Sequence, residues 1–203
     1  MRNKTFISSM VLSVACVSAA NAGVVDPFTT PQTTYNTFTS ITGGLFNQRQ
    51  LIKSGGGSGS VASGSVNFVP NNTTGGQPAF GLGYRQADGS SIDLSGITSM
   101  SFDITVGGGA YNLLWVITDS NNIAKAIDYE VNGVSSGTVT FTFPGSGDPG
   151  FNYASVKKME VTFGLGISST GVLSNFNFTA VPAPGALALL GAAGLVGARR
   201  RRA

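Results

Sequence analysis

Histidine is absent from this sequence of 203 residues, and cysteine occurs only once, as Cys16. A chain with one cysteine forms no internal disulfide, and without histidine or further cysteines it lacks the usual ligands of a zinc site. Catalytic triads that use histidine as the general base are excluded for the same reason. The chemistry open to this chain therefore comes from carboxylate, hydroxyl, amide and aromatic side chains.

Charged residues are also scarce, at 10% of the sequence against roughly 25% in a typical globular protein. The net charge of +3 arises at the two ends, because Arg2, Lys4 and the cluster 199–202 supply half of the twelve cations. The residues between these ends hold six cations and nine acids, a net charge of −3. This distribution gives no support to nucleic-acid binding.

Glycine is abundant, with 29 residues, and Ser, Thr and Asn fill most of the polar positions. Hydrophobic residues make up 41% of the chain, which is enough to build a core and argues against disorder. The length favours a single domain. Low charge combined with many Gly, Thr, Val and Phe residues predicts β-structure with frequent turns.

The first 22 residues, MRNKTFISSMVLSVACVSAANA, have the three parts of a secretory signal peptide. A basic start and an apolar stretch over 6–17 precede Ala20 and Ala22, which place small residues at the cleavage-site spacing. We expect signal peptidase to cut before Gly23. A buried N-terminal helix and a lipoprotein signal at Cys16 are the alternatives.

The chain ends with VPAPGALALLGAAGLVGARRRRA, residues 181–203. The fourteen residues Gly185–Ala198 are all Gly, Ala, Leu or Val, and as a helix they would cover roughly 21 Å of a hydrocarbon core about 30 Å thick. Four arginines follow, and they would hold the cytoplasmic side of a membrane. These are Arg199, Arg200, Arg201 and Arg202.

This tail resembles the PEP-CTERM sorting signal of exported bacterial proteins, which joins a Pro-Glu-Pro-type motif to a short apolar helix and a basic cluster. The helix corresponds to 186–198, and Ala183 stands where the family usually has Glu. The resemblance implies that an exosortase-type enzyme in the inner membrane removes the tail, which holds the protein in that membrane until then. A permanent tail anchor is the alternative; a core helix is disfavoured by the arginines behind an all-apolar run. The motif position is filled by Val181, Pro182, Ala183, Pro184 and Gly185.

Residues 23–180 alternate apolar and polar side chains with the period of a β-strand, as in 99–106 and 137–143. The apolar run 113–117 is followed by an Asx-rich turn, so 111–131 predicts a hairpin. We expect an all-β, antiparallel β-sandwich of the jelly-roll type rather than a closed barrel. The ten predicted strands are 36–42, 48–53, 60–69, 79–85, 99–106, 111–118, 123–131, 137–143, 157–164 and 172–179.

The stretch 92–104, IDLSGITSMSFDI, resembles the start of a central strand in jelly rolls of the carbohydrate-binding-module type. The stretch 153–163 is similar to their closing strands. Many exported PEP-CTERM proteins carry such a domain, so the resemblance implies the same fold here.

The sequence predicts no catalytic, cofactor-binding or metal-binding residue. Asp103 and Asp119 could be carboxylate partners across the sheet, yet each also suits a solvated strand or a turn. A glycoside hydrolase needs two carboxylates held about 5–9 Å apart in a cleft. The oxygen-rich stretches 88–93 and 119–122 could bind calcium, but neither matches the EF-hand pattern and turn formation explains both. The glycine-rich stretch 55–60 lacks the ending of a P-loop and reads as a flexible loop.

Aromatic rings are the usual platform for sugars, and the candidate rings are Tyr111, Trp115 and Tyr153, with Asn112 and Asp119 nearby in sequence. Trp115 lies in the most apolar strand, so we expect it in the core. Tyr111 follows a glycine-rich loop and is the better candidate for an exposed ring.

We therefore expect an exported, non-enzymatic protein of the cell envelope or extracellular matrix of a Gram-negative-type bacterium, associated with exopolysaccharide or biofilm. The alternative is a carbohydrate-binding module for a defined glycan, and a permanently tail-anchored surface protein and a glycan-active enzyme rank below it. The expected partners are signal peptidase, an exosortase-type enzyme, the inner membrane and polysaccharide. An exposed aromatic platform would favour the carbohydrate-binding module, whereas a Ser/Thr/Asn-rich surface would favour the matrix protein.

Overall fold

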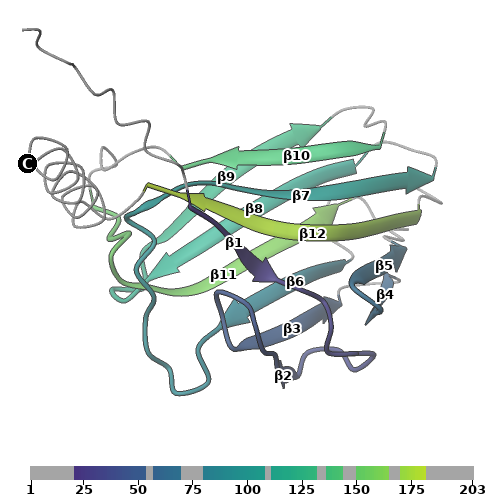
Figure 1. Cartoon of the computed structure of the whole chain (residues 1–203), viewed down its shortest axis with the longest axis horizontal. Helices are drawn as coiled ribbons and strands as arrows, with labels where there is room; N and C mark the ends of the chain where they lie inside the picture. Colours follow the sequence, from purple (N-terminus) through teal and green to yellow (C-terminus); the bar gives the residue numbers. More distant parts are fainter. Residues whose placement is uncertain are drawn as a thin grey trace, which may run out of the picture. The chain divides into compact units, whose positions relative to one another are not determined.

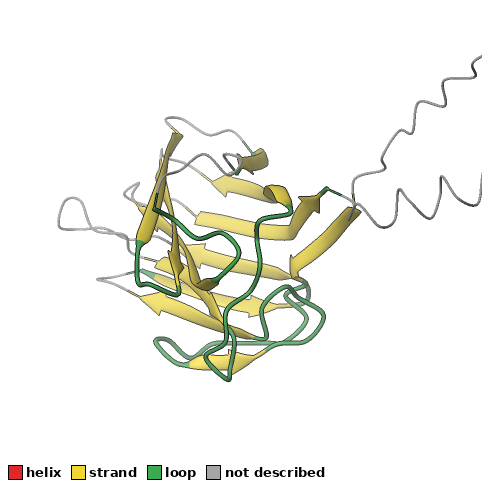
Figure 2. Cartoon of the chain, turned by 90° about the vertical axis from the view of Figure 1, so that its left-hand side faces the viewer, coloured by secondary structure: helices red, strands yellow, loops and turns green. Residues whose placement is uncertain are grey.

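The computed structural model describes residues 21–53, 57–69, 80–107, 111–131, 136–143, 150–164 and 170–181. This part of the chain consists of strands and loops and contains no helix (Figure 2). It accordingly includes no helix with the length and apolarity needed to cross a membrane. The predicted signal peptide up to Ala20 and the predicted tail from Pro182 lie outside these ranges.

In these described ranges, twelve strands form two antiparallel sheets of six strands each (Figure 1). Sheet A has the order β10-β7-β12-β5-β4, with β1 also paired to β12, and sheet B has the order β2-β3-β6-β11-β8-β9. The predicted all-β, antiparallel sandwich is confirmed. The strands are β1 Asn21–Asp26, β2 Phe38–Ser40, β3 Gln48–Lys53, β4 Ser58–Ala62, β5 Ser65–Val69, β6 Phe80–Arg85, β7 Ile97–Gly107, β8 Tyr111–Asp119, β9 Ala124–Val131, β10 Gly137–Thr142, β11 Val156–Gly164 and β12 Thr170–Ala180.

The core lies between the two sheets, where aromatic rings from both meet. Phe68 of sheet A stacks on Phe163 of sheet B with a centroid distance of 4.6 Å, and Trp115 of sheet B meets Phe141 of sheet A edge-on at 4.2 Å. These contacts follow from the period-two pattern, since every second side chain of a strand with one buried face points inward. The predicted inward residues of 137–143 are all buried. The predicted hairpin over 111–131 is also present, as the pair β8–β9.

One predicted strand is wrong. The stretch 60–69 forms a hairpin, β4 and β5, instead of a single strand. The chain reverses at Ser63 and Gly64, which both have positive φ, 51° and 81°. Two consecutive residues of this kind make the tight turn whose twist matches antiparallel strands, and glycine accepts positive φ without strain. The Ser-Gly pair was the sequence signal for this turn.

Strand β1 was not among the predicted strands. It pairs with the end of β12, with Asn21 opposite Ala180 and Ala22 opposite Thr179. It therefore begins two residues before Gly23, the predicted first residue after signal-peptide cleavage. The predicted cleavage position lies within β1, and the remaining residues up to Asp26 would still pair with β12.

Two glycines in sheet A lie directly opposite phenylalanines in the neighbouring strand. Gly171 faces Phe68, and Gly23 faces Phe178. A Cβ added at either glycine would lie 2.2 Å from the facing ring. The missing side chain leaves the space that each ring occupies, so these glycines are packing residues.

We predict that Gly171→Ala lowers the free energy of unfolding by about 1–3 kcal/mol, because the added methyl group overpacks the Phe68 ring. The control is Gly96→Ala, since a Cβ at Gly96 meets nothing within 4 Å, and we expect it to change stability by less than about 0.5 kcal/mol. Urea unfolding, followed by the fluorescence of the single tryptophan, measures both. Equal losses in the two variants would contradict this account of Gly171.

Candidate functional site

The outer face of sheet A carries an uncharged array of side chains over β4, β5 and the start of β12. In one row Ser60 lies opposite Asn67, which lies opposite Val172; in the next row Ser58 lies opposite Val69. Neighbours within a row are about 4.8 Å apart, and the rows are about 7 Å apart. We call these residues and Thr170 the sheet A array: Ser58, Ser60, Asn67, Val69, Thr170 and Val172.

The sheet A array lines an open concavity with a volume of about 530 Å³. Tyr35 also lines the concavity and fixes the edge strand β4, because its hydroxyl accepts a hydrogen bond from Gly59 N at 2.7 Å and donates one to Gly59 O at 2.8 Å. Gln32 and Val61 exchange two further backbone hydrogen bonds. The segment that contains Gln32 and Tyr35 therefore fixes strand β4, which forms one side of the concavity.

The chemistry of the array is neutral and amphipathic. It presents three hydroxyls and one amide beside two valines, Val69 and Val172, which are 38% and 37% exposed. Among the residues that the structure describes, no charged side chain lines the concavity. Hydroxyls and amides can exchange hydrogen bonds with a polyol, and the exposed methyl groups offer apolar surface to its C–H groups.

Asp103 lies on the same outer face of sheet A, opposite Ser174 and two residues along β12 from Val172 of the array. Both of its carboxylate oxygens already accept hydrogen bonds. They accept hydrogen bonds from Asn175 Nδ2 at 2.7 Å and Thr138 Oγ1 at 2.6 Å. These two hydrogen bonds, that of Asn175 first, lower the pKa of Asp103. Asp119 belongs to β8 of sheet B, so the hypothesis that the two carboxylates are partners across one sheet is wrong.

Asp119 is fully buried and has a structural role at the β8–β9 turn. Its Oδ1 accepts hydrogen bonds from the backbone N–H groups of Asn121 and Ile123, both at 2.9 Å, and its Oδ2 accepts one from Asn152 at 3.1 Å. Desolvation raises the pKa of this carboxyl, but the backbone donors of Ile123, Asn152 and Asn121 outweigh it and the pKa lies below its ordinary value. The turn interpretation of 119–122 is therefore preferred to a calcium site.

We predict that the stabilising effect of Asp119 depends on pH. Because the pKa of Asp119 is lower in the folded than in the unfolded chain, the charged group stabilises the fold above the unfolded value, about 3.9, and this contribution is lost as the pH falls through the folded value. The stability difference between the wild type and Asp119→Asn should be largest near neutral pH and shrink in acid. Urea unfolding at several pH values measures it, and a difference that stays constant into acid would contradict the prediction.

The second oxygen-rich stretch also consists of turns. Asp88 Oδ1 accepts a hydrogen bond from Ser90 N at 3.0 Å, and Asp93 Oδ1 accepts one from Ser95 N at 2.8 Å. These bonds to the residue two positions ahead are Asx turns. Within the described ranges, no group of three or more acidic, histidine or cysteine side chains could hold a metal ion.

Two of the three candidate sugar-binding rings are buried. Trp115 is 0% exposed, as expected for a core residue, and Tyr153 is 8% exposed, so neither offers a platform. Tyr111 begins β8, but its side chain and that of Asn112 are not described. Every aromatic side chain that the structure describes is buried or half-buried, and the half-buried Phe38 is covered by the Arg85 guanidinium 3.6 Å from its centroid.

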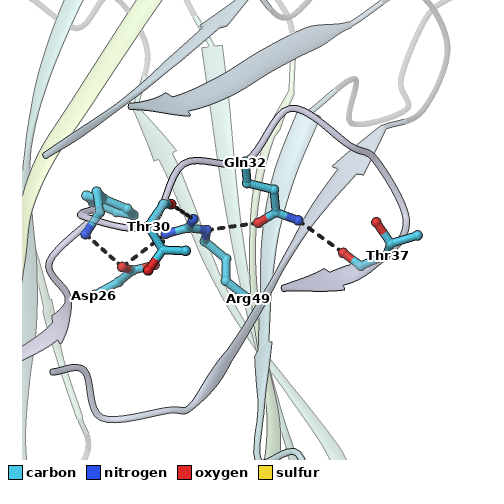
Figure 3. A network of polar contacts seen from close by, with 6 residues as sticks. Asp26, Thr30, Gln32, Thr37 and Arg49 are labelled. Carbon is cyan, nitrogen blue, oxygen red and sulfur yellow. Dashed lines mark hydrogen bonds and ion pairs between the residues drawn. The ribbon is translucent and has the colours of Figure 1, made fainter. Parts of the chain in front are cut away.

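A buried ion pair was missed at the sequence level. Arg49 Nη1 lies 2.8 Å from Asp26 Oδ2, and both side chains are at most 1% exposed (Figure 3). Arg49 also donates from Nε to Gln32 Oε1 at 3.1 Å and from Nη2 to Thr30 O at 2.6 Å. This network joins β3 to the segment that follows β1. Its burial makes it a structural element and not a ligand site.

No protein-family model matches the sequence, and no curated protein matches it. Several solved structures are similar in backbone arrangement. The family 11 carbohydrate-binding module of a cellulosomal cellulase of Clostridium thermocellum has 14% identity and a TM-score of 0.44, with 81% of this chain and 97% of that chain covered. A family 29 carbohydrate-binding module complexed with mannohexaose has 12% identity and a TM-score of 0.47, with 79% and 92% covered.

An agarase matches over 80% of this chain and 25% of its own, with 11% identity and a TM-score of 0.48. With TM-scores below 0.5, these similarities define neither a family nor a ligand for this chain.

The residues of the predicted sorting motif lie outside the described ranges, apart from Val181, which is exposed and donates its N–H to Gly96 O at 2.9 Å.

Proposed function

We propose that this protein is an exported, non-catalytic component of the cell envelope or extracellular matrix that contacts exopolysaccharide through the sheet A array. The observation that carries this proposal is the uncharged set of hydroxyl, amide and valine side chains in a concavity of about 530 Å³. A neutral polysaccharide presents hydroxyls and C–H surfaces in alternation, which this array can match. The described residues that line the concavity include no carboxylate that could act as a general acid or base.

The array lies at the opposite end of β12 from Val181. The chain reaches Val181 at one end of β12, whereas Thr170 and Val172 lie at the other end. An eleven-residue strand is about 35 Å long. The array therefore lies about a strand length from Val181, the last described residue before the predicted tail.

A second candidate function is recognition of one defined glycan, as in a carbohydrate-binding module. The concavity favours it, because a hollow surface contacts more of a ligand than a flat one. The two functions differ in selectivity: a matrix component should bind related neutral polysaccharides with similar, weak affinity. A module for a defined glycan should prefer one of them clearly.

Export and processing are tested by intact-mass spectrometry of the protein from the envelope and medium fractions of its native host. We expect a chain that begins at Gly23 and has lost the residues after the motif 181–185. Recovery of only the chain 23–203, in membranes, would overturn tail removal and leave a permanent anchor. A panel of neutral and acidic polysaccharides then separates the two binding functions.

A further inference from the structure

The described strands include five edge strands: β10, β4 and β1 in sheet A, and β2 and β9 in sheet B. An edge strand exposes backbone N–H and C=O groups that can pair with another chain. Natural proteins protect such edges with charges, with very short strands or with a covering segment. Four of these five edges carry one of these protections, and at β1 it is the segment after β2, where Leu45 N donates to Val25 O at 3.0 Å.

Strand β4 is covered by the segment before β2. Gln32 N donates to Val61 O at 3.1 Å, Val61 N donates to Gln32 O at 2.9 Å, and the Tyr35 hydroxyl pairs with both backbone groups of Gly59. Strand β2 is only three residues long. Strand β9 contains three charged residues in eight, Lys125, Asp128 and Glu130.

Strand β10 has none of these protections in the part of the chain that the structure describes. Its sequence, GTVTFT, has no charge and no proline and is rich in residues that favour strands. The whole stretch 131–147 is uncharged. Among the described strands β10 pairs with β7 alone, and its exposed outer face carries Thr138, Thr140 and Thr142.

We propose that β10 is the docking edge for a second copy of this chain. Two β10 strands would pair antiparallel about a two-fold axis and join two A sheets into one continuous sheet. Such a pairing is self-complementary, because each strand offers the other the backbone groups that point away from β7. The exposed threonine side chains of the two strands then lie side by side, and no charged residue of β10 opposes the pairing.

The test compares two lysine variants of the purified exported protein by sedimentation velocity over a wide concentration range. Thr140→Lys places a charge on the edge strand, and Thr105→Lys places the same charge on the same outer face of β7, an inner strand; both threonines are exposed. We expect the wild type and Thr105→Lys to dimerise alike. Thr140→Lys should weaken the dimer by about tenfold or more, because two lysines meet across the axis.

Amide hydrogen exchange provides a readout that does not depend on folding stability alone. On dimerisation the β10 amides should exchange more slowly, whereas those of β9 should be unchanged. A wild-type protein that stays monomeric at every concentration would overturn the proposal, and so would equal association of the two lysine variants. Slower exchange in β9 and not in β10 would show that the interface lies at β9, and this result would overturn the proposal as well. None of these outcomes depends on polysaccharide binding.

Discussion

Arg49→Met should lower the free energy of unfolding by about 3–5 kcal/mol, because it leaves a buried carboxylate without its cation. The Asp26 side chain is 1% exposed, and its Oδ2 lies 2.8 Å from Arg49 Nη1. Methionine has a similar length but no hydrogen-bond donor. Asp26, Gln32 Oε1 and Thr30 O, which all accept hydrogen bonds from the guanidinium, would each lose one. The segment that crosses from β1 to β2 would lose its attachment to β3. Urea unfolding of both proteins measures the loss.

The matched control is Lys158→Met, which removes the cation of a surface ion pair. Lys158 Nζ lies 2.9 Å from Glu160 Oε1, but the two side chains are 46% and 26% exposed. Water screens this pair, so we expect a loss of at most about 1 kcal/mol. Similar losses in the two variants would show that burial does not determine how much the Arg49–Asp26 pair contributes to the free energy of unfolding.

Trp115→Ala should also lower the free energy of unfolding by about 3–5 kcal/mol, as expected for removing a large buried ring. The Trp115 ring is fully buried and lies 4.2 Å from the Phe141 centroid and 5.5 Å from that of Phe143. Val116, the next residue, is half-buried on the outer face of sheet B. Val116→Ala is therefore the control, with an expected loss of about 1 kcal/mol. Circular dichroism follows both unfolding transitions.

If Trp115 were a sugar platform, Trp115→Ala would leave the stability nearly unchanged and abolish binding. The same residue gives a second readout in the wild type, because it is the single tryptophan. We expect an emission typical of a buried indole, without a change when polysaccharide is added.

The sequence was sufficient to predict the strands whose two faces differ in polarity. The predicted strand 157–164 is present, and its alternate residues Met159, Val161 and Phe163 are buried, because period-two alternation reports directly on which face meets the core. The β4–β5 hairpin was missed because apolar residues continue on both sides of Ser63 and Gly64, so the alternation hid the reversal. The turn depends on positive φ at both residues, and a Ser-Gly pair suggests this only weakly.

The candidate site could not be predicted from the sequence, for a different reason. Asn67 and Val172 lie opposite each other only because β5 pairs with β12, two strands far apart in the chain. Ser, Thr and Asn occur throughout the sequence, so composition predicts a polar surface but does not locate a concavity on it. The Arg49–Asp26 pair has the same origin: neither residue shows its burial until β1 and β3 are placed in the fold.

We propose that the sheet A array contacts exopolysaccharide, and affinity electrophoresis tests this contact most directly. The assay measures how far the exopolysaccharide of the native host, cast into the gel, retards the purified protein. The double variant Asn67→Ala/Val172→Ala removes an amide and a valine from the array. The control Gln50→Ala/Val116→Ala removes an amide and a valine from the outer face of sheet B.

We predict that the polysaccharide retards the wild type and the control equally, and that the Asn67/Val172 variant binds about tenfold more weakly or not at all. Equal retardation of all three proteins, or no retardation of the wild type, would contradict the account.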